Sequence, residues 1–500
     1  MEQSAPPGRR PGRPTRNRTD PGSRMTPIES ASEARVAGQG FASRLSRIPA
    51  RWKGAGMLKP YLASIGHLLS GNFGGVMIMM ASLAIATRAL GQEQFGVLAV
   101  ILSIGRVCER LIRFESWQPL VRFVAAEEET GDSARISSLY AYGLMLDVGS
   151  ALVAAVLSVA VAWFAGDLIG IGRSNVDLVA IYACAIACNP RGMSSAALRL
   201  AGRFRTLAYV QLASFVVRFA FSVLIYALGG GLLWFVLVWT ASQILDSALF
   251  NLSGFRALND TGIPSPLKAD WRDLPGRFPG FMRFAISTNL SSTLRTMTHE
   301  MDTLLVSTFA GASAAGLYYL SRRIARVAQT AGDMIQTVIY PDLARLWNKV
   351  GPGAMGQLVS MLQLSLAGIA LTAVGACWLV GKPAIELVFG PGFSDSYELL
   401  LVQLFAVLLT LHGTPARAAL LAMNRPTYVL ISSFAAAAAF FSVALLLIPR
   451  FGALGANYAH IAFGVATVIL LDTAFWRNLR RAEREAQPAP KPAFAAEAEA

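Results

Sequence analysis

Charged residues are scarce in this chain. Aspartate, glutamate, lysine and arginine make up 15% of its 500 residues, whereas a soluble chain usually carries about a quarter. Hydrophobic types make up 54%, and the mean hydropathy is +0.48. These values exclude an ordinary soluble globular protein. They favour a membrane protein with many spans, provided that the apolar residues occur in long runs.

Cysteine is scarce too. Cys108, Cys184, Cys188 and Cys377 all fall in apolar segments. Cys184 and Cys188 lie one helical turn apart, but no histidine or carboxylate completes a set of metal ligands. We therefore interpret the four cysteines as small buried hydrophobic residues, and we predict neither a metal nor a cofactor.

Nucleotide-binding and catalytic motifs are missing. The chain has neither a GxxxxGK[ST] nor a GxGxxG sequence. The acidic residues of the longest outer connection, 381–396, are scattered and have no evident partner. The sequence therefore indicates a protein that is not an enzyme. A membrane polysaccharide polymerase or ligase, which would need a large outer loop, remains the alternative from another class.

Long apolar runs are the main feature of the chain. A helix needs about 20 residues to cross a bilayer, and such runs occur throughout the middle of the sequence. We predict twelve spans. They are 61–87, 94–116, 138–165, 176–198, 206–228, 231–252, 281–308, 313–338, 354–380, 397–421, 427–448 and 453–475.

The basic residues predict the orientation. Twenty-nine lysines and arginines fall in the two termini and the even-numbered connections, and only four fall in the odd-numbered ones. Because cytoplasmic loops are enriched in these residues, we expect both termini in the cytoplasm. The net charge of +14 then mostly reflects topology.

The two ends of the chain are expected to be disordered. Residues 1–60 form a basic arm rich in proline and glycine, with no apolar run that would make a signal peptide. The arm could touch anionic lipid headgroups, but it lacks the interleaved aromatics of a nucleic-acid binder. Residues 476–500 form a low-complexity cytoplasmic tail.

The middle of the chain reads as two related halves. At an offset of 220 residues, three positions repeat, and each half also has a proline in its fourth span, Pro190 and Pro415. The repeated pairs are Gly91 with Gly311, Gly96 with Gly316, and Arg106 with Arg326. With six spans in each half, the two copies share one orientation, which places a pseudo-twofold axis along the membrane normal.

The predicted fold is therefore an all-α polytopic membrane protein of about twelve transmembrane helices. Two six-helix lobes would enclose a central cavity. The predicted parts are the basic arm 1–60, an N-lobe 61–252 (helices 1–6), a cytoplasmic linker 253–280, a C-lobe 281–475 (helices 7–12) and the tail 476–500.

Ionisable residues inside the spans are the strongest functional signal, because each costs about 2.5–3.5 kcal/mol at mid-bilayer. Eleven arginines and about eight carboxylates fall in or near the predicted spans, with no lysine. Some arginines can pair with neighbouring carboxylates or reach the interface near helix ends, as we expect for Arg191, Arg283 and Arg417. The excess indicates an anionic substrate, since guanidinium suits bidentate contact with phosphate or carboxylate. The predicted substrate contacts are Arg106, Arg110, Arg113, Arg295, Arg322 and Arg326.

Several motifs resemble bacterial oligosaccharide flippases, the Wzx-like polysaccharide transporters of the multidrug/oligosaccharidyl-lipid/polysaccharide exporter superfamily. In 88–123 the matching pieces are Leu90-Gly91, Phe95-Gly96 and Gln118-Pro119-Leu120. The second half offers MDTLLVSTFAGASAAGLYYLSRRIARV (301–327), YPDLARL (340–346) and FGPGF (389–393). The resemblance covers about 61–475, while the basic arm lies outside the usual pattern.

The resemblance implies a function. Such proteins move undecaprenyl-pyrophosphate-linked oligosaccharide repeat units from the cytoplasmic to the periplasmic leaflet, for O-antigen, capsule or exopolysaccharide assembly. The implied partners are the lipid-linked oligosaccharide, membrane lipids, a polysaccharide polymerase and a chain-length regulator, with no nucleic acid. The alternatives within the superfamily are a flippase for the lipid-linked peptidoglycan precursor and a multidrug cation antiporter.

The energy source is expected to be a proton or cation gradient, because no ATP-binding motif is present. The candidate carriers are Glu109, His299, Glu300, Asp302 and Asp333, although each of them could instead be a structural partner of a nearby arginine.

Overall fold

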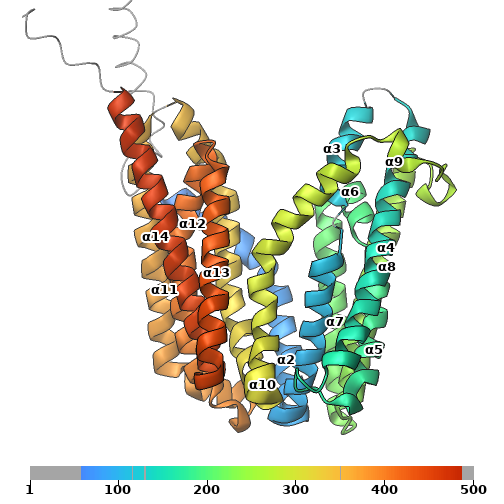
Figure 1. Cartoon of the computed structure of the whole chain (residues 1–500), viewed down its shortest axis with the longest axis vertical. Coiled ribbons are helices and arrows are strands. Elements are labelled where there is room, and N and C mark those ends of the chain that lie inside the picture. Colours follow the sequence, from blue (N-terminus) through green and yellow to red (C-terminus); the bar gives the residue numbers. More distant parts are fainter. Residues whose placement is uncertain (1–57, 115, 129–130, 350, 487–500) are drawn as a thin grey trace, which may run out of the picture. The chain divides into compact units, whose positions relative to one another are not determined.

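The computed structural model describes residues 58–114, 116–128, 131–349 and 351–486. Every regular element within these ranges is a helix, as Figure 1 shows. Three short 3-10 helices, η3 (Arg173–Asn175), η4 (Pro266–Lys268) and η5 (Pro391–Phe393), lie in the connections. The α-helices in chain order are α2 (Leu58–Ile112), α3 (Trp117–Glu128), α4 (Ser133–Ala165), α5 (Val176–Ala187), α6 (Gly192–Leu200), α7 (Phe204–Ala227), α8 (Leu232–Asp260), α9 (Leu274–Arg277), α10 (Phe281–Lys349), α11 (Pro352–Phe389), α12 (Ser396–Ala422), α13 (Pro426–Phe451) and α14 (Ala453–Ala486).

Eight stretches in the described residues are long and apolar enough to cross a membrane, which confirms a polytopic all-α membrane protein. The count of twelve spans and their division into two lobes stay predictions. The eight stretches are Ser133–Ala165, Tyr209–Ala227, Leu232–Asp260, Glu300–Thr330, Pro352–Phe389, Ser396–Ala422, Pro426–Phe451 and Ala453–Glu485.

Two pairs of predicted spans are joined by kinks instead of loops. The first two spans form α2, which bends at Gly91, and the seventh and eighth form α10, which bends at Gly311. Gly91 has φ 67° and ψ −176°, and Gly311 has φ 85° and ψ 171°. A residue with a side chain rarely adopts a positive φ, so both bends depend on glycine. The two positions repeat in structure as well as in sequence.

The predicted fourth span, 176–198, is broken. α5 ends at Ala187 and α6 begins at Gly192, with Pro190 in the break. Proline lacks the N–H that would continue the helix, and it pushes the preceding residue out of helical conformation. Pro415, by contrast, lies inside the continuous helix α12. The two prolines therefore do not play equivalent roles.

Two predicted connections are shorter than expected. α8 continues to Asp260, so the first eight residues of the predicted linker 253–280 are helical. α11 continues through Pro383 to Phe389, which leaves six residues, 390–395, before α12. Buried apolar side chains explain both extensions: Ala257 and Leu258 of α8 are 1% and 2% exposed, and Ile385 and Phe389 of α11 are 3% and 6% exposed. Their packing favours continued helix.

The predicted disordered tail also begins with helix. α14 reaches Ala486, so 476–486 were wrongly assigned to the tail, and 487–500 lie outside the described residues together with 1–57. Leu479 explains the extension, because it is 2% exposed and lies over Gly356 of α11.

The prediction that all four cysteines are buried is wrong for two of them. Cys184 of α5 and Cys188 at the C-cap of α5 are exposed.

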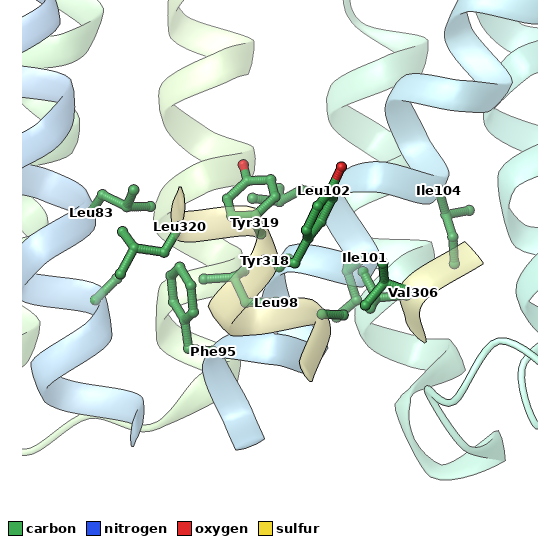
Figure 2. Packing of buried hydrophobic residues seen from close by; sticks show 14 of the residues in the cluster. Leu83, Phe95, Leu98, Ile101, Leu102, Ile104, Val306, Tyr318, Tyr319 and Leu320 are labelled. Carbon is green, nitrogen blue, oxygen red and sulfur yellow. The ribbon is translucent and has the colours of Figure 1, made fainter. Parts of the chain in front are cut away.

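α3 to α8 pack together, α10 to α14 pack together, and α10 also contacts α3. α11, α12, α13 and α14 lie side by side in Figure 1. The largest buried cluster joins α2 to α10, and Figure 2 shows its side chains. Phe95 packs edge-on against Tyr319 at 6.1 Å and against Phe393 at 5.4 Å between ring centroids. Because lipid is as apolar as this cluster, close packing matters more here than removal from water.

Candidate functional site

Three arginines gather where α2 meets α10. Arg106 of α2 donates from Nε to Glu300 Oε2 at 2.8 Å, and Arg326 donates from Nη1 to Glu300 Oε1 at 3.1 Å. Arg106 also donates to the Tyr319 hydroxyl at 3.2 Å. Arg323 lies over the Tyr319 ring, with its guanidinium carbon 4.9 Å from the centroid. We call Arg106, Arg323, Arg326, Glu300 and Tyr319 the arginine cluster.

The arginine cluster carries an excess of positive charge. Among its five members, the arginine cluster has one carboxylate and three guanidiniums, and arginine stays protonated in proteins. The Glu300 side chain is 9% exposed, but Arg106 is 21% and Arg326 is 34% exposed. The carboxylate is thus enclosed while the arginines remain accessible. A ligand with two negative charges would balance the cluster.

Arg322 points elsewhere. Its Nε donates to Asp302 Oδ2 at 2.8 Å, and both side chains are almost fully buried. The Tyr318 hydroxyl donates to the same oxygen at 2.9 Å, and Nε2 of His460 on α14 lies 3.0 Å from it. We call Asp302, Tyr318, Arg322 and His460 the Asp302 cluster. A buried arginine enclosed by its own partners is not placed to reach a substrate in this conformation, contrary to our expectation for Arg322.

Arg113 belongs to a third group, at the break between α5 and α6. Its Nη1 donates to Glu109 Oε1 at 2.5 Å, and its Nη2 donates to the Asn189 carbonyl at 3.2 Å. The Asn189 side chain donates to the same Glu109 oxygen at 2.8 Å. Arg191 donates to Asn189 Oδ1 at 2.6 Å and also pairs with Asp246 of α8. Arg191 therefore pairs with a carboxylate, one of the two arrangements that we expected for it.

Asp147 fixes the far side of the same break. It is buried in α4, and its carboxylate accepts from the Met193 N–H at 2.6 Å and the Ser116 hydroxyl at 2.9 Å. Met193 is in the first turn of α6, where backbone N–H groups lack partners and attract negative charge. A Cβ at Gly192 would lie 2.5 Å from Asp147, so this packing requires glycine. Asp147 therefore anchors the start of α6.

Of the remaining predicted site residues, Glu109, Glu300 and Asp302 are members of the groups above. Arg110 is half-buried on α2. The side chains of Arg295, His299 and Asp333 lie outside the described residues, so their roles stay predictions. Glu109, Glu300 and Asp302 each pair with an arginine, which fits a structural role as well as one in coupling.

One end of the α2–α10 contact is tightly closed. Gly96 lies against the backbone of Ala312, and Gly316 lies against the backbone of Gln92 and Gly96. The glycines that repeat in sequence thus pack against each other's helix. Arg88 donates to the carbonyls of Leu387 and Val388.

Side chains of α2 and α10 complete this end, two of them by binding carbonyl groups of connections. Gln92 donates to the Gly392 carbonyl, and Ser313 donates to Gln92 Oε1 at 3.2 Å. Ser307 donates to the Ile169 carbonyl at 2.5 Å. We call the contacts of Arg88, Gln92, Gly96, Ser307, Ser313 and Gly316 the closed end.

Sequence reasoning missed His460 and Arg323 and the role of Asp147. His460 is a single histidine in an apolar helix, and no motif surrounds it. Arg323 directly follows Arg322, and no motif predicts that its guanidinium lies over the Tyr319 ring. Only the rarity of such residues inside spans could have singled them out.

Comparison with known protein sequences identifies the family of this chain and a relative. A family model described as "Polysaccharide biosynthesis protein" matches residues 85–398. The inner membrane protein YghQ of Escherichia coli (strain K12) is 24% identical over 350 residues, which cover 70% of this chain and 98% of that protein.

Two solved structures share the fold. An inward-facing multidrug resistance MATE family transporter of the MOP superfamily has a TM-score of 0.65 at 11% identity, and the match covers 83% of this chain and 96% of that one. The lipid II flippase MurJ in an inward closed conformation has a TM-score of 0.63 at 13% identity, covering 81% and 87%.

Proposed function

Because the chain belongs to the polysaccharide biosynthesis protein family, we propose that it flips an undecaprenyl-pyrophosphate-linked oligosaccharide from the cytoplasmic to the periplasmic leaflet. The family and the shared fold support a multi-pass membrane flippase. The substrate and the direction of transport are our proposal. The product would enter O-antigen, capsule or exopolysaccharide assembly.

The arginine cluster carries this proposal. A pyrophosphate esterified at both ends, by a lipid and by a sugar, keeps one ionised oxygen on each phosphorus. Its two negative charges match the excess among the cluster's members, in which Arg106 and Arg326 pair with Glu300 and Arg323 lies over the Tyr319 ring. Guanidinium groups bind such oxygens through paired, charge-assisted hydrogen bonds.

Glu300 gives the site a way to release its ligand. In this conformation it holds Arg106 and Arg326. An arriving pyrophosphate would exchange with the Glu300 carboxylate instead of meeting free arginines. Exchange of one ion pair for another lowers the net binding energy. A carrier needs such moderate affinity, because it must bind and release the same substrate.

Alternating access would expose the arginine cluster to one leaflet and then to the other. The residues of the closed end lie in the odd-numbered connections or beside them, which the basic-residue count places on the outer side. Opening this end while the opposite end closes would expose the cluster to the periplasm. Such rocking of helix sets around a fixed site is the usual mechanism in transporters built from repeats.

A cationic drug fits this site less well. Binding a cation beside Arg106, Arg323 and Arg326 would add like charges, whose repulsion is strong where water is scarce. The similarity to a MATE transporter supports the fold alone. We therefore favour the anionic lipid over a multidrug antiporter.

The proposal can be tested in a strain that lacks this gene and carries plasmid-borne variants. We expect Arg106→Ala and Arg326→Ala to leave the protein in the membrane while lipid-linked repeat units accumulate in the cytoplasmic leaflet. Arg345→Ala is the matched control, because Arg345 is 64% exposed near the end of α10 and pairs only locally with Asp342. Normal surface polymer with both cluster variants would refute the role of the cluster.

A further inference from the structure

An apolar groove lies between α7 and α8. Its volume is about 580 Å³, and its walls include Phe221, Leu224, Trp234 and Leu237. The groove occupies the half of the two helices next to their connecting turn, 228–231. Phe221 and Trp234 are each more than half exposed, so the groove opens toward the lipid and not into the protein core.

A cation marks the inner end of the groove. Ser242 lines it, and Arg218 of α7 donates from Nε to the Ser242 hydroxyl at 2.8 Å. The Arg218 guanidinium also lies 5.4 Å from the Trp239 ring centroid. Arg218 is held by a hydroxyl group and by the faces of aromatic rings. None of these groups carries a full negative charge, so these contacts do not neutralise the guanidinium.

The groove continues toward the arginine cluster. Tyr182 of α5 donates to the side chain of Gln243, the neighbour of Ser242 on α8, at 3.1 Å. A Cβ at Gly105 would lie 2.5 Å from the Tyr182 ring, so the ring packs against α2 next to Arg106. The lipid-facing groove is therefore connected to the arginine cluster through Tyr182.

We propose that this groove holds the polyprenyl chain of the substrate while Arg218 and the arginine cluster hold its pyrophosphate. The inference rests on the proposed function and names where the lipid part binds. A polyprenyl pyrophosphate has one strongly anionic end and one long apolar chain. The groove and the cluster offer those two environments side by side.

The depth of Arg218 favours this occupant over a resident phospholipid. Ten residues separate Arg218 from Leu228 at the end of α7, which is about 15 Å of helix. That is half of the roughly 30 Å hydrocarbon core of a bilayer. A phospholipid at rest keeps its headgroup at the interface. Only a lipid whose headgroup crosses the membrane brings phosphate to the depth of Arg218.

The test uses the full chain in nanodiscs of neutral phospholipid. The probe is a polyprenyl pyrophosphate with a diazirine along its chain, and crosslinked peptides are mapped by mass spectrometry. We expect labelling on α7 and α8 within 217–245. Ala241→Trp, which fills the groove, should lower this labelling at least tenfold. Ala248→Trp is the matched control, because it is exposed two turns along the same face of α8 and does not line the groove.

A second variant protects the test against misfolding. If Ala241→Trp does not reach the membrane, Leu224→Trp fills the groove from the opposite wall. Labelling elsewhere, or undiminished labelling in the filled variant, overturns the inference. A phosphatidylcholine that carries a diazirine provides a further check. If it labels the groove equally well in the presence of the pyrophosphate probe, the groove holds a resident lipid, and this outcome also overturns the inference.

Binding of inorganic pyrophosphate separates this inference from the proposed function. Calorimetry should show binding to the wild type and to Ala241→Trp, and a loss of at least tenfold in Arg106→Ala. If pyrophosphate binds as expected but the chain probe avoids the groove, only the groove assignment fails. If the wild type does not bind pyrophosphate, the proposed function fails.

Discussion

Replacing Gly96 with alanine probes the closed end directly. A Cβ at this position would lie 1.9 Å from the Ala312 carbonyl oxygen, whereas ordinary contact begins near 3.4 Å. The obstacle is backbone, so no side chain can turn away. α2 and α10 must separate by roughly 1.5 Å at this point. Overpacking of this kind costs about 1–3 kcal/mol.

The cost applies only while the two helices touch. Taking about 2 kcal/mol, the population of the closed form relative to an open one should fall by roughly thirtyfold. The assay is modification of a cysteine at Ser313 by a membrane-impermeant thiol reagent, in a chain whose four native cysteines are replaced by serine. We expect modification to become at least tenfold faster in Gly96→Ala.

The control is Gly375→Ala, because nothing lies within 4 Å of a Cβ on Gly375. It should change neither the modification rate nor the melting temperature. An unchanged rate in a stable Gly96→Ala protein would refute the argument, since it would mean that the close approach of α2 and α10 does not limit access to this end.

Three further predictions concern the buried acids. Glu300→Gln should tighten binding of inorganic pyrophosphate in calorimetry, because it releases Arg106; weaker binding would mean that Glu300 mainly organises the site. Asp302→Asn should lower stability by about 3–5 kcal/mol, because it leaves the Arg322 charge buried without its partner; the check is the melting temperature, and lost binding at unchanged stability would contradict a structural role. Asp147→Ala should cost about 1–3 kcal/mol through lost contacts with α6; an unchanged melting temperature would show that α6 does not depend on this anchor.

Much of the fold could be predicted because membrane insertion depends on local composition. The runs that became α4, α12 and α13 stand out by length and hydropathy alone. The repeat singled out Gly91 and Gly311 but predicted loops there, whereas both glycines are kinks of continuous helices with a positive φ. The break before α6 was missed although Pro190 was noted, because proline also occurs inside continuous membrane helices, as Pro415 does in α12. The carboxylate that binds the start of α6, Asp147, comes from another helix.

The partners of the arginines could not be predicted from spacing. Arg322 and Arg326 are four residues apart and so share a helix face. Yet Arg322 pairs with the buried Asp302, while Arg326 pairs with Glu300 beside α2. The choice depends on which helices pack on either side of α10. Arg106 meets Glu300 across 194 residues of chain, a contact that no local pattern encodes.

Transport by the purified protein is the most direct test of the central claim. Vesicles would contain a fluorescent undecaprenyl-pyrophosphate-linked oligosaccharide and either the wild type or Arg106→Ala, and a glycosidase added outside would report the exposed fraction. We predict that the wild type brings the protected lipid to the outer leaflet, and that Arg106→Ala slows this at least tenfold at equal protein content. Equal rates in the wild type, the variant and protein-free vesicles would contradict translocation of this lipid by the arginine cluster.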